Sequence, residues 1–179
     1  MIVSVVEHDP VWKAAYEEEA QRIIDALDEH LLNAFHIGST NVPGLTAEPI
    51  IDILLVVDSI ADMDSLNERF TGLHYEAMGE SGVKGRRYYR KGGEKRTHQI
   101  HAFQFDNLWD IERHLVFKEY LKAHPAVRDT YGNLKNRLAR SFPNDVERYS
   151  EGKHEFIRAV EREALRWHYK NRRKAGCAR

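Results

Sequence analysis

Residues 36–57 read HIGSTNVPGLTAEPIIDILLVV and place one carboxylate, Asp52, inside an apolar run that has the composition of a buried strand. Burying an aspartate costs several kcal/mol unless its charge is compensated, so the fold has to supply a partner for Asp52. The candidate partners are a cationic side chain, a metal ion and a set of backbone N–H donors. The identity of this partner bears on both the fold and the function of the protein.

The turn Gly38-Ser39-Thr40 follows a predicted strand and has the features of a phosphate-binding turn. Glycine permits close approach of the backbone, and free N–H groups together with a serine hydroxyl can hold anionic oxygens. Mg²⁺ in proteins is usually held by one or two carboxylates plus substrate phosphates, so Asp52 strengthens the signal. Taken singly, an ordinary strand-to-loop turn and a buried Asp–Arg pair explain these residues. Their combination favours a functional site.

The composition limits the function classes. The chain has 179 residues, 27 basic and 28 acidic side chains and a formal net charge of -1, which does not favour a nucleic-acid partner. Cys177 is the single cysteine, so neither an intramolecular disulfide nor a cysteine-based zinc site is expected. The apolar runs are too short to cross a bilayer. We expect a cytoplasmic protein without a membrane partner, and the oligomeric state stays open.

The first half of the chain alternates between strand and helix patterns. Val3 and Val5 predict a short opening strand, and Asp9-Pro10 predicts the start of a helix that runs to about Leu32. NAFHIG predicts a strand that enters the glycine turn, and PIIDILLVV predicts a central strand covered on both faces.

The remaining elements are predicted by the same patterns. A short helix with Met63, Leu66 and Phe70 ends at Gly72, and LHYEAM returns as a strand. Residues 85–105 predict a hairpin that turns at Gly92-Gly93. Three amphipathic helical patterns follow from about Asn107. The sequence thus predicts a mixed α/β part followed by a helical part.

FHIGSTNVPGLTAEPIIDILLVV resembles the signature of the GrpB family, a branch of the nucleotidyltransferase-fold superfamily. Further segments resemble that family along nearly the whole chain, namely THQIHAF, RHLVFKEYLKAHP, YGNLKNRLA and YSEGKHEFI. The resemblance implies an α/β (α+β) fold, with a nucleotidyltransferase-like mixed β-sheet and flanking helices. It also implies one domain over residues 1–179, in which a helical part, 107–179, packs on the sheet part, 1–106.

The resemblance also implies a metal site. In the superfamily a Gly-Ser turn precedes a strand with two alternating acidic residues, and a third acid stands on a later strand. Asp52 fills the first acidic position, but the second is Leu54, on the same face of the strand, which puts a two-metal clamp in doubt. His101 stands where the third acid is expected. The implied cofactor is a divalent metal, Mg²⁺ or Mn²⁺, while imidazole ligation makes Zn²⁺ or Ni²⁺ possible.

Two residues of the last helix complete the implied site. Lys153 lies one turn after Tyr149, and over a cleft the pair would bind a phosphate and stack on a base. The alternative is a solvated lysine and a packing tyrosine. The basic hairpin is better explained as a solvated, edge-protecting element than as a binding surface; its cations are Arg86, Arg87, Arg90, Lys91, Lys95 and Arg96.

Two functions are compatible with these residues. The first is a nucleotidyltransferase-like enzyme that binds a nucleoside triphosphate or another phosphorylated small molecule at Gly38, Ser39, Thr40, Tyr149 and Lys153. In this hypothesis Asp52 and Lys153 are catalytic, and Asp52 and His101 hold the metal. The second is a protein that binds such a ligand without transferring it, as a sensor or partner subunit; Leu54 is its main support.

Overall fold

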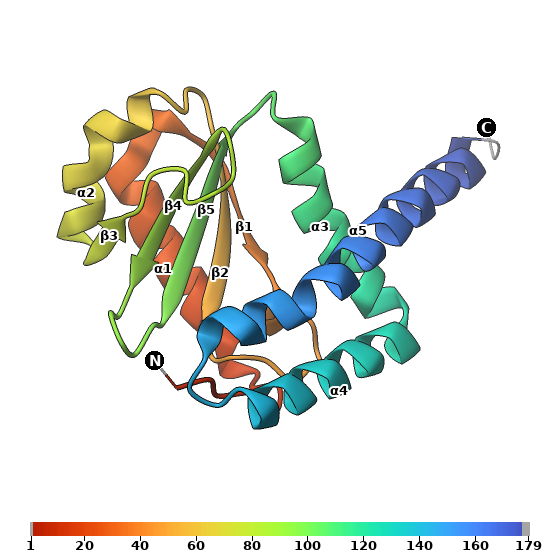
Figure 1. Cartoon of the computed structure of the whole chain (residues 1–179). Helices are drawn as coiled ribbons and strands as arrows, with labels where there is room; N and C mark the ends of the chain where they lie inside the picture. Colours follow the sequence, from red (N-terminus) through yellow and green to blue (C-terminus); the bar gives the residue numbers. More distant parts are fainter. Residues whose placement is uncertain (1, 177–179) are drawn as a thin grey trace.

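The computed structural model describes residues 2–176, which form a five-stranded mixed sheet with helices on both faces (Figure 1). The strand order is β1-β2-β5-β4-β3, where β2 and β5 are parallel and all other neighbours are antiparallel. The strands are β1 (Leu31–Ile37), β2 (Ile51–Val57), β3 (Tyr75–Ala77), β4 (Arg86–Lys91) and β5 (His98–Gln104).

The alternation of side chains along β2 divides the core into two layers. Ile51, Ile53, Leu55 and Val57 face α1 (Val11–Leu27) and α2 (Asn67–Gly72), where they join the largest apolar cluster. Leu54 faces the opposite side and packs with Ile37, Phe103 and Ile111 beneath α3 (Leu108–Ala123). Since β2 is covered on both faces, its nearly continuous apolar sequence is explained.

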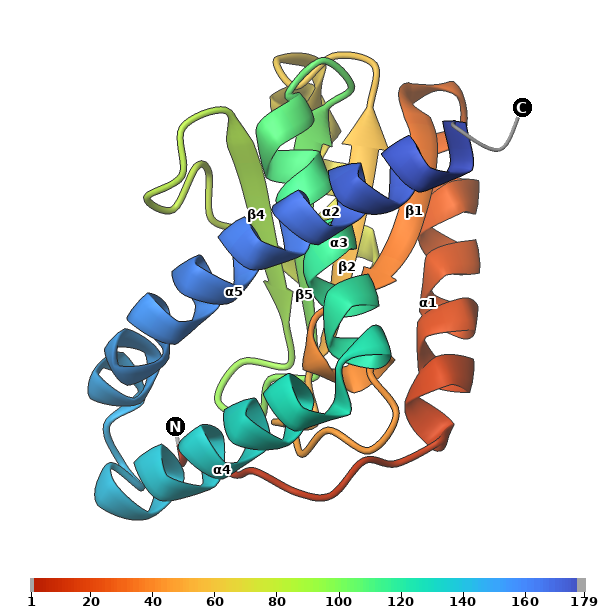
Figure 2. The ribbon, with the colours of Figure 1, turned by 90° about the vertical axis from the view of Figure 1, so that its right-hand side faces the viewer.

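The helical part packs on the α3 face of the sheet. It contains α3, α4 (Pro125–Ser141) and α5 (Val146–Gly176), with α5 crossing α3 and forming a V with α4 (Figure 2). The Asn107 side chain accepts from the Asp110 N–H at the start of α3, and Pro125 occupies the first turn of α4. A third apolar cluster joins all three helices to the loop after β1; it contains Val42, Leu45, Phe117, Leu121, Tyr131 and Val160.

Two sequence predictions are wrong. The first helix ends at Leu27 and not near Leu32, because Asp28 adopts a positive φ of 48° and Leu31 pairs with Val57 in the sheet. Helical spacing cannot reveal this pairing, which is a tertiary contact. The predicted opening strand at Val3 and Val5 is absent; the segment makes one isolated bridge, between Val6 and Ala47.

The other element predictions are confirmed within a few residues. β4 and β5 form the predicted hairpin, and its tip at Gly92-Gly93 is exposed. Its interpretation as a solvated edge element is wrong, because β3 pairs with the free side of β4 and both Arg86 and Arg96 line a cleft. The short helix ends at Gly72 and is followed by β3, and three helices follow residue 107. No helix within residues 2–176 combines the length and apolar composition needed to cross a membrane.

Leu54 gives a direct test of the sheet-to-α3 packing. It is fully buried among apolar side chains, so Leu54→Ala is expected to lower the free energy of unfolding by about 2–5 kcal/mol. Leu54→Asp should lower it further or prevent folding, because the new carboxylate would lack a partner. The measurement is urea unfolding. Leu32→Asp is the control, since Leu32 is exposed on β1. Wild-type stability of Leu54→Asp would contradict this account.

Candidate functional site

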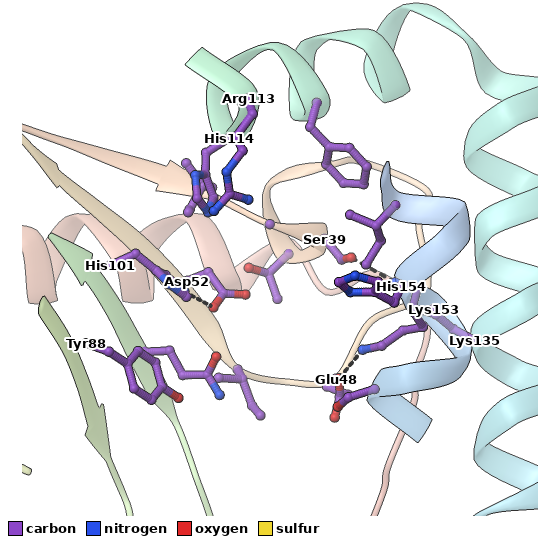
Figure 3. Close-up of a pocket in the computed structure, with 18 of the residues that line it drawn as sticks. Ser39, Glu48, Asp52, Tyr88, His101, Arg113, His114, Lys135, Lys153 and His154 are labelled. Atoms are coloured by element: carbon purple, nitrogen blue, oxygen red, sulfur yellow. Dashed lines mark hydrogen bonds and ion pairs between the residues drawn. The ribbon is translucent and has the colours of Figure 1, made fainter. Parts of the chain in front are cut away.

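A cleft of about 760 Å³ opens between the α3 face of the sheet and helices α4 and α5 (Figure 3). The sheet side contributes Asp52 from β2, Tyr88 from β4 and His101 from β5. The opposite side contributes Lys135 from α4 and Lys153 from α5. The turn after β1 lies between the two sides, so the cleft unites the sheet part and the helical part.

The Gly38 turn and Asp52 lie against each other. Ile37 pairs with Asp52 in the β1–β2 ladder, so the turn begins beside the carboxylate. Gly38 has a φ of 72°, and a Cβ on it would lie 2.6 Å from the Asp52 Oδ2. Both the conformation and the space therefore require glycine here. Ser39 follows Gly38 directly in the chain, and Ser39 and Asp52 both line the cleft.

Hydrogen bonds from neighbouring strands compensate the Asp52 charge. The His101 Nε2 lies 3.2 Å from the Asp52 Oδ1. The Gln99 amide, oriented with its nitrogen toward Asp52, donates to the same oxygen at 3.1 Å. Among the residues that the structure describes, no arginine forms an ion pair with Asp52. The Asp52 side chain is 27% exposed and its other oxygen remains at the cleft.

The hydrogen bonds of His101 define its tautomer. The Arg86 guanidinium donates to the His101 Nδ1 at 3.4 Å, so the Nε2 carries the hydrogen that is donated to Asp52. His114 lies next to His101, and partial burial together with His101 holds the pKa of its imidazole well below the ordinary value. His114 is therefore neutral near pH 7.

Asp52 and His101 fit one cation better than two. Within residues 2–176 no group of three or more His, Cys, Asp or Glu side chains could hold a metal ion. Leu54, at the position of a second acid, is buried beneath α3 and does not line the cleft. The two side chains could bind one cation whose remaining ligands are phosphate oxygens. A two-metal clamp does not fit these residues.

Lys135 on α4 is a cleft residue that the sequence reasoning missed. It is only 2% exposed, and its Nζ donates to the Ser39 Oγ at 2.9 Å and to the Thr46 carbonyl. It has no ion pair with a carboxylate among the described residues. Burial and the nearby Lys153 lower its pKa to about 7. The sequence does contain a sign of its burial, because Lys135 lies four residues after Tyr131 and therefore falls on the apolar face of the predicted helix.

Lys153 lines the cleft, but Tyr149 does not. The Lys153 Nζ lies 3.3 Å from a Glu48 carboxylate oxygen and 4.1 Å from the centre of the Tyr149 ring. Tyr149 is fully buried, so its ring supports Lys153 and is not available for stacking on a base. Glu48 is a second cleft carboxylate that sequence reasoning missed, because it lies in the loop before β2.

Thr40 supports the turn from behind. Its hydroxyl lies 2.9 Å from the His36 Nε2, and both side chains are buried. Burial and the Lys118 ammonium lower the pKa of His36 to about 4, so this histidine is neutral near pH 7. The contact fixes the turn, while the Ser39 hydroxyl remains on the side of Lys135.

The cleft is more basic than the chain as a whole. Three acidic side chains line it, Glu48, Asp52 and Glu161, against five basic ones, Arg86, Arg96, Arg113, Lys135 and Lys153. The formal charge of the whole chain is -1. This concentration of positive charge around a turn with a serine hydroxyl is suited to an anionic ligand.

Sequence comparison identifies related proteins. A family model described as GrpB protein matches residues 2–163. Protein YqkA of Bacillus subtilis is 39% identical over 92% of this chain, which spans 48% of the length of YqkA. The dephospho-CoA kinase of Mycobacterium leprae is 26% identical over 91% of this chain and 46% of its own length.

Comparison of structures identifies the fold. The crystal structure of GrpB from Enterococcus faecalis has a TM-score of 0.89 and 47% identity, and the match covers 93% of this chain and 99% of that one. Terminal uridylyl transferase 4 from Trypanosoma brucei with bound CTP has a TM-score of 0.51 and 15% identity, over 93% of this chain and 53% of that one. At this identity the likeness shows the fold alone, which is that of nucleotidyltransferases.

Lys135 should make stability depend on pH. Its pKa is about 7 in the folded protein and near 10.5 when unfolded, so between these values the unfolded chain binds more protons. Folding stability should therefore rise with pH over this range, by up to ~1.4 kcal/mol per unit relative to Lys135→Met. Urea unfolding at several pH values measures the difference. Lys13→Met, at an exposed lysine, is the control. Parallel pH profiles for wild type and Lys135→Met would refute the assignment.

Proposed function

The chain belongs to the GrpB family, and from this premise we propose that its cleft binds a nucleoside triphosphate with a divalent cation and transfers a nucleotidyl group to an acceptor. The observation that carries the proposal is the contact of the buried Lys135 with Ser39, beside Asp52. A buried lysine without a carboxylate partner is costly, and a bound anion would compensate its charge.

The phosphates are proposed to lie between the turn and the two lysines. The turn amides and the Ser39 hydroxyl donate to phosphate oxygens, and glycine at 38 allows the backbone to approach them. Lys135 becomes fully charged when an anion lies beside it, because a nearby negative charge raises the pKa of an ammonium group. Lys153 can exchange Glu48 for a phosphate and offset negative charge on the transferred group.

Asp52 is proposed to hold the cation, with His101 as a second ligand. Mg²⁺ or Mn²⁺ suits the carboxylate and the phosphate oxygens, whereas Zn²⁺ or Ni²⁺ would use the imidazole more strongly. When bound, such a cation neutralises phosphate charge and orients the triphosphate. His101 could ligate through Nε2 only in its other tautomer, with the hydrogen moved to Nδ1, which would replace both its hydrogen bond to Asp52 and the one it accepts from Arg86.

The proposed transfer conserves atoms and charge. An acceptor hydroxyl attacks the α-phosphorus and forms a new P–O bond, the bond to the β-phosphate oxygen breaks, and pyrophosphate leaves. The hydroxyl proton passes to water. The charges of Lys135 and Lys153 and the donors of the turn stabilise the negative charge that is spread over the phosphates during this step.

Binding without transfer is the alternative, and two observations favour it. Leu54 and the lack of a third ligand side chain in the described region leave the metal site incomplete for a two-metal mechanism. The match to the dephospho-CoA kinase also covers less than half of that protein, which fits a region that binds a phosphorylated ligand beside another activity. In this alternative the chain is a sensor or a partner subunit.

Labelled nucleoside triphosphates separate the two functions. Binding is measured by equilibrium dialysis with Mg²⁺ or Mn²⁺, and transfer by pyrophosphate release in the presence of hydroxyl-bearing acceptors. Pyrophosphate release that needs an acceptor and is lost in Lys153→Met supports transfer. Binding without release over a broad acceptor set supports the alternative. Failure of all four common nucleoside triphosphates to bind would refute the transfer function and restrict the alternative to a different phosphorylated small molecule.

Asp52→Asn tests the cation site. The variant keeps volume and much of the hydrogen bonding, so the apo protein should melt within a few degrees of wild type. Mn²⁺ with a nucleoside triphosphate at a hundred times the Kd should raise the wild-type Tm by roughly 5–10 °C, and should raise that of Asp52→Asn far less. Asp129→Asn, at an exposed aspartate of α4, is the control. Equal ligand shifts in Asp52→Asn and wild type would refute the metal role.

Nucleotide binding should also take up a proton. Lys135 is largely neutral at pH 8 because its pKa is about 7, and the bound phosphates favour its charged form. Calorimetry in buffers with different ionisation enthalpies should therefore detect uptake of up to about one proton per ligand at pH 8, which Lys135→Met should lack. Uptake of the same size in the variant would assign the proton to another group.

A further inference from the structure

We propose that a second groove, continuous with the cleft, binds the acceptor, and that this acceptor is a nucleotide unit with a free ribose hydroxyl. The acceptor role of the groove rests on the proposed function. Its ability to bind a nucleotide rests only on the residues that line it. It lies between the loop at residues 82–84, α3 and α5, and has a volume of about 1250 Å³.

The groove opens into the cleft beside Asp52. Arg86, His101, Arg113 and His114 line both cavities. Figure 3 shows Arg113 and His114 above the Asp52–His101 pair, and Figure 2 shows α5 crossing α3. A ligand in the groove would thus present one end to Asp52. That end is where an acceptor hydroxyl has to lie if the triphosphate occupies the cleft.

The groove has more basic than acidic side chains, and two of its arginines form no ion pair with a described carboxylate, although Arg158 lies close enough to Glu161 to offset in part the rise that burial causes in the pKa of that carboxyl group. Its two acidic lining residues, Asp110 and Glu161, are both paired with Arg113, at 2.8 and 3.2 Å. By contrast, Arg158 and Arg162 form no hydrogen bond or ion pair with any described side chain, and they lie one turn apart on α5. These arginines can bind the phosphates of a ligand without breaking an existing ion pair.

Two large aromatic side chains at the groove remain half exposed. Trp109 at the start of α3 is 53% exposed and Tyr169 on α5 is 51% exposed. The Tyr169 hydroxyl donates to Glu112 at 3.2 Å, which holds its ring between the two helices. The Arg172 guanidinium lies 6.0 Å from the centre of the Tyr169 ring. Partly exposed aromatic rings beside arginines form the usual combination for stacking a base and binding its phosphate.

The dimensions limit the ligand to a few nucleotides. Arg158, Arg162 and Arg166 extend along about 12 Å of α5, and the chain as a whole has a charge of -1. The same chemistry is present in a free mononucleotide and in the 3′ end of a single-stranded RNA, and the experiment distinguishes these sources.

The test measures binding of a fluorescent RNA hexamer with a free 3′ hydroxyl, without nucleoside triphosphate or metal. The double variant Arg158→Gln/Arg162→Gln should bind the hexamer about tenfold more weakly or worse, with a salt slope that is smaller by about 1.4. Arg148→Gln, at an exposed arginine of α5 outside the groove, is the charge control. Trp109→Ala should also weaken binding, while Leu108→Ala, at its exposed neighbour, should not.

Competition identifies the source of the ligand. If AMP displaces the hexamer when its concentration equals that of the nucleotide units in the hexamer, the natural ligand is a free nucleotide. If AMP does not compete, the natural ligand is an RNA end. If neither the hexamer nor millimolar AMP binds, or if the double variant binds as wild type does, the inference is overturned. Nucleoside triphosphate binding, measured separately, should be unchanged in the double variant. Hexamer binding without triphosphate binding would refute the proposed function and leave the groove assignment standing.

Discussion

The close approach of the Gly38 backbone to the Asp52 carboxylate constrains the cleft more than any other contact. It requires a residue without a Cβ at a positive φ, and the next residue, Ser39, accepts a hydrogen bond from Lys135 across the cleft. The register of two ladders then completes the arrangement. Ile37 pairs with Asp52 on one side of β2, and Asp52 with Gln99 on the other, so both Gln99 and His101 are held near the carboxylate by backbone hydrogen bonds.

The charge distribution in the cleft depends on two lysines, from α4 and α5, that lie opposite Asp52. On the sheet side, Asp52 is contacted by His101 at 3.2 Å and by the Gln99 amide at 3.1 Å. The helical side adds Lys135 and Lys153, and the first is too buried to be fully charged near pH 7. Under the proposed function, a ligand that carries phosphate oxygens and a cation would place its cation at Asp52 and its negative charge beside the incompletely charged Lys135.

Patterns with a short period predicted most of the fold and several residues that line the cleft. Alternation identified β2 and the hairpin, helical spacing identified α3 to α5, and the turn residues together with Asp52 indicated a phosphate site. Lys135 and Glu48 escaped because their importance depends on contacts between distant segments: Lys135 reaches Ser39 from α4, and Glu48 meets Lys153 from α5. The stacking role predicted for Tyr149 is wrong because the environment of this residue also depends on contacts between distant segments. Its position on the helix was predicted correctly, but its complete burial depends on how α5 packs.

Leu54 shows how one face of a strand can serve two environments. Asp52 and Leu54 point to the same side of β2, yet the first borders the cleft and the second is fully enclosed with Ile37, Phe103 and Ile111. The boundary between cleft and core therefore passes between two residues that are neighbours on one face. A carboxylate at position 54 would need α3 to move away from the sheet, because Ile111 lies over it. The apolar residue at this position is thus part of the packing that holds α3, and through Arg113 and His114 it helps to shape the wall that the cleft and the groove share.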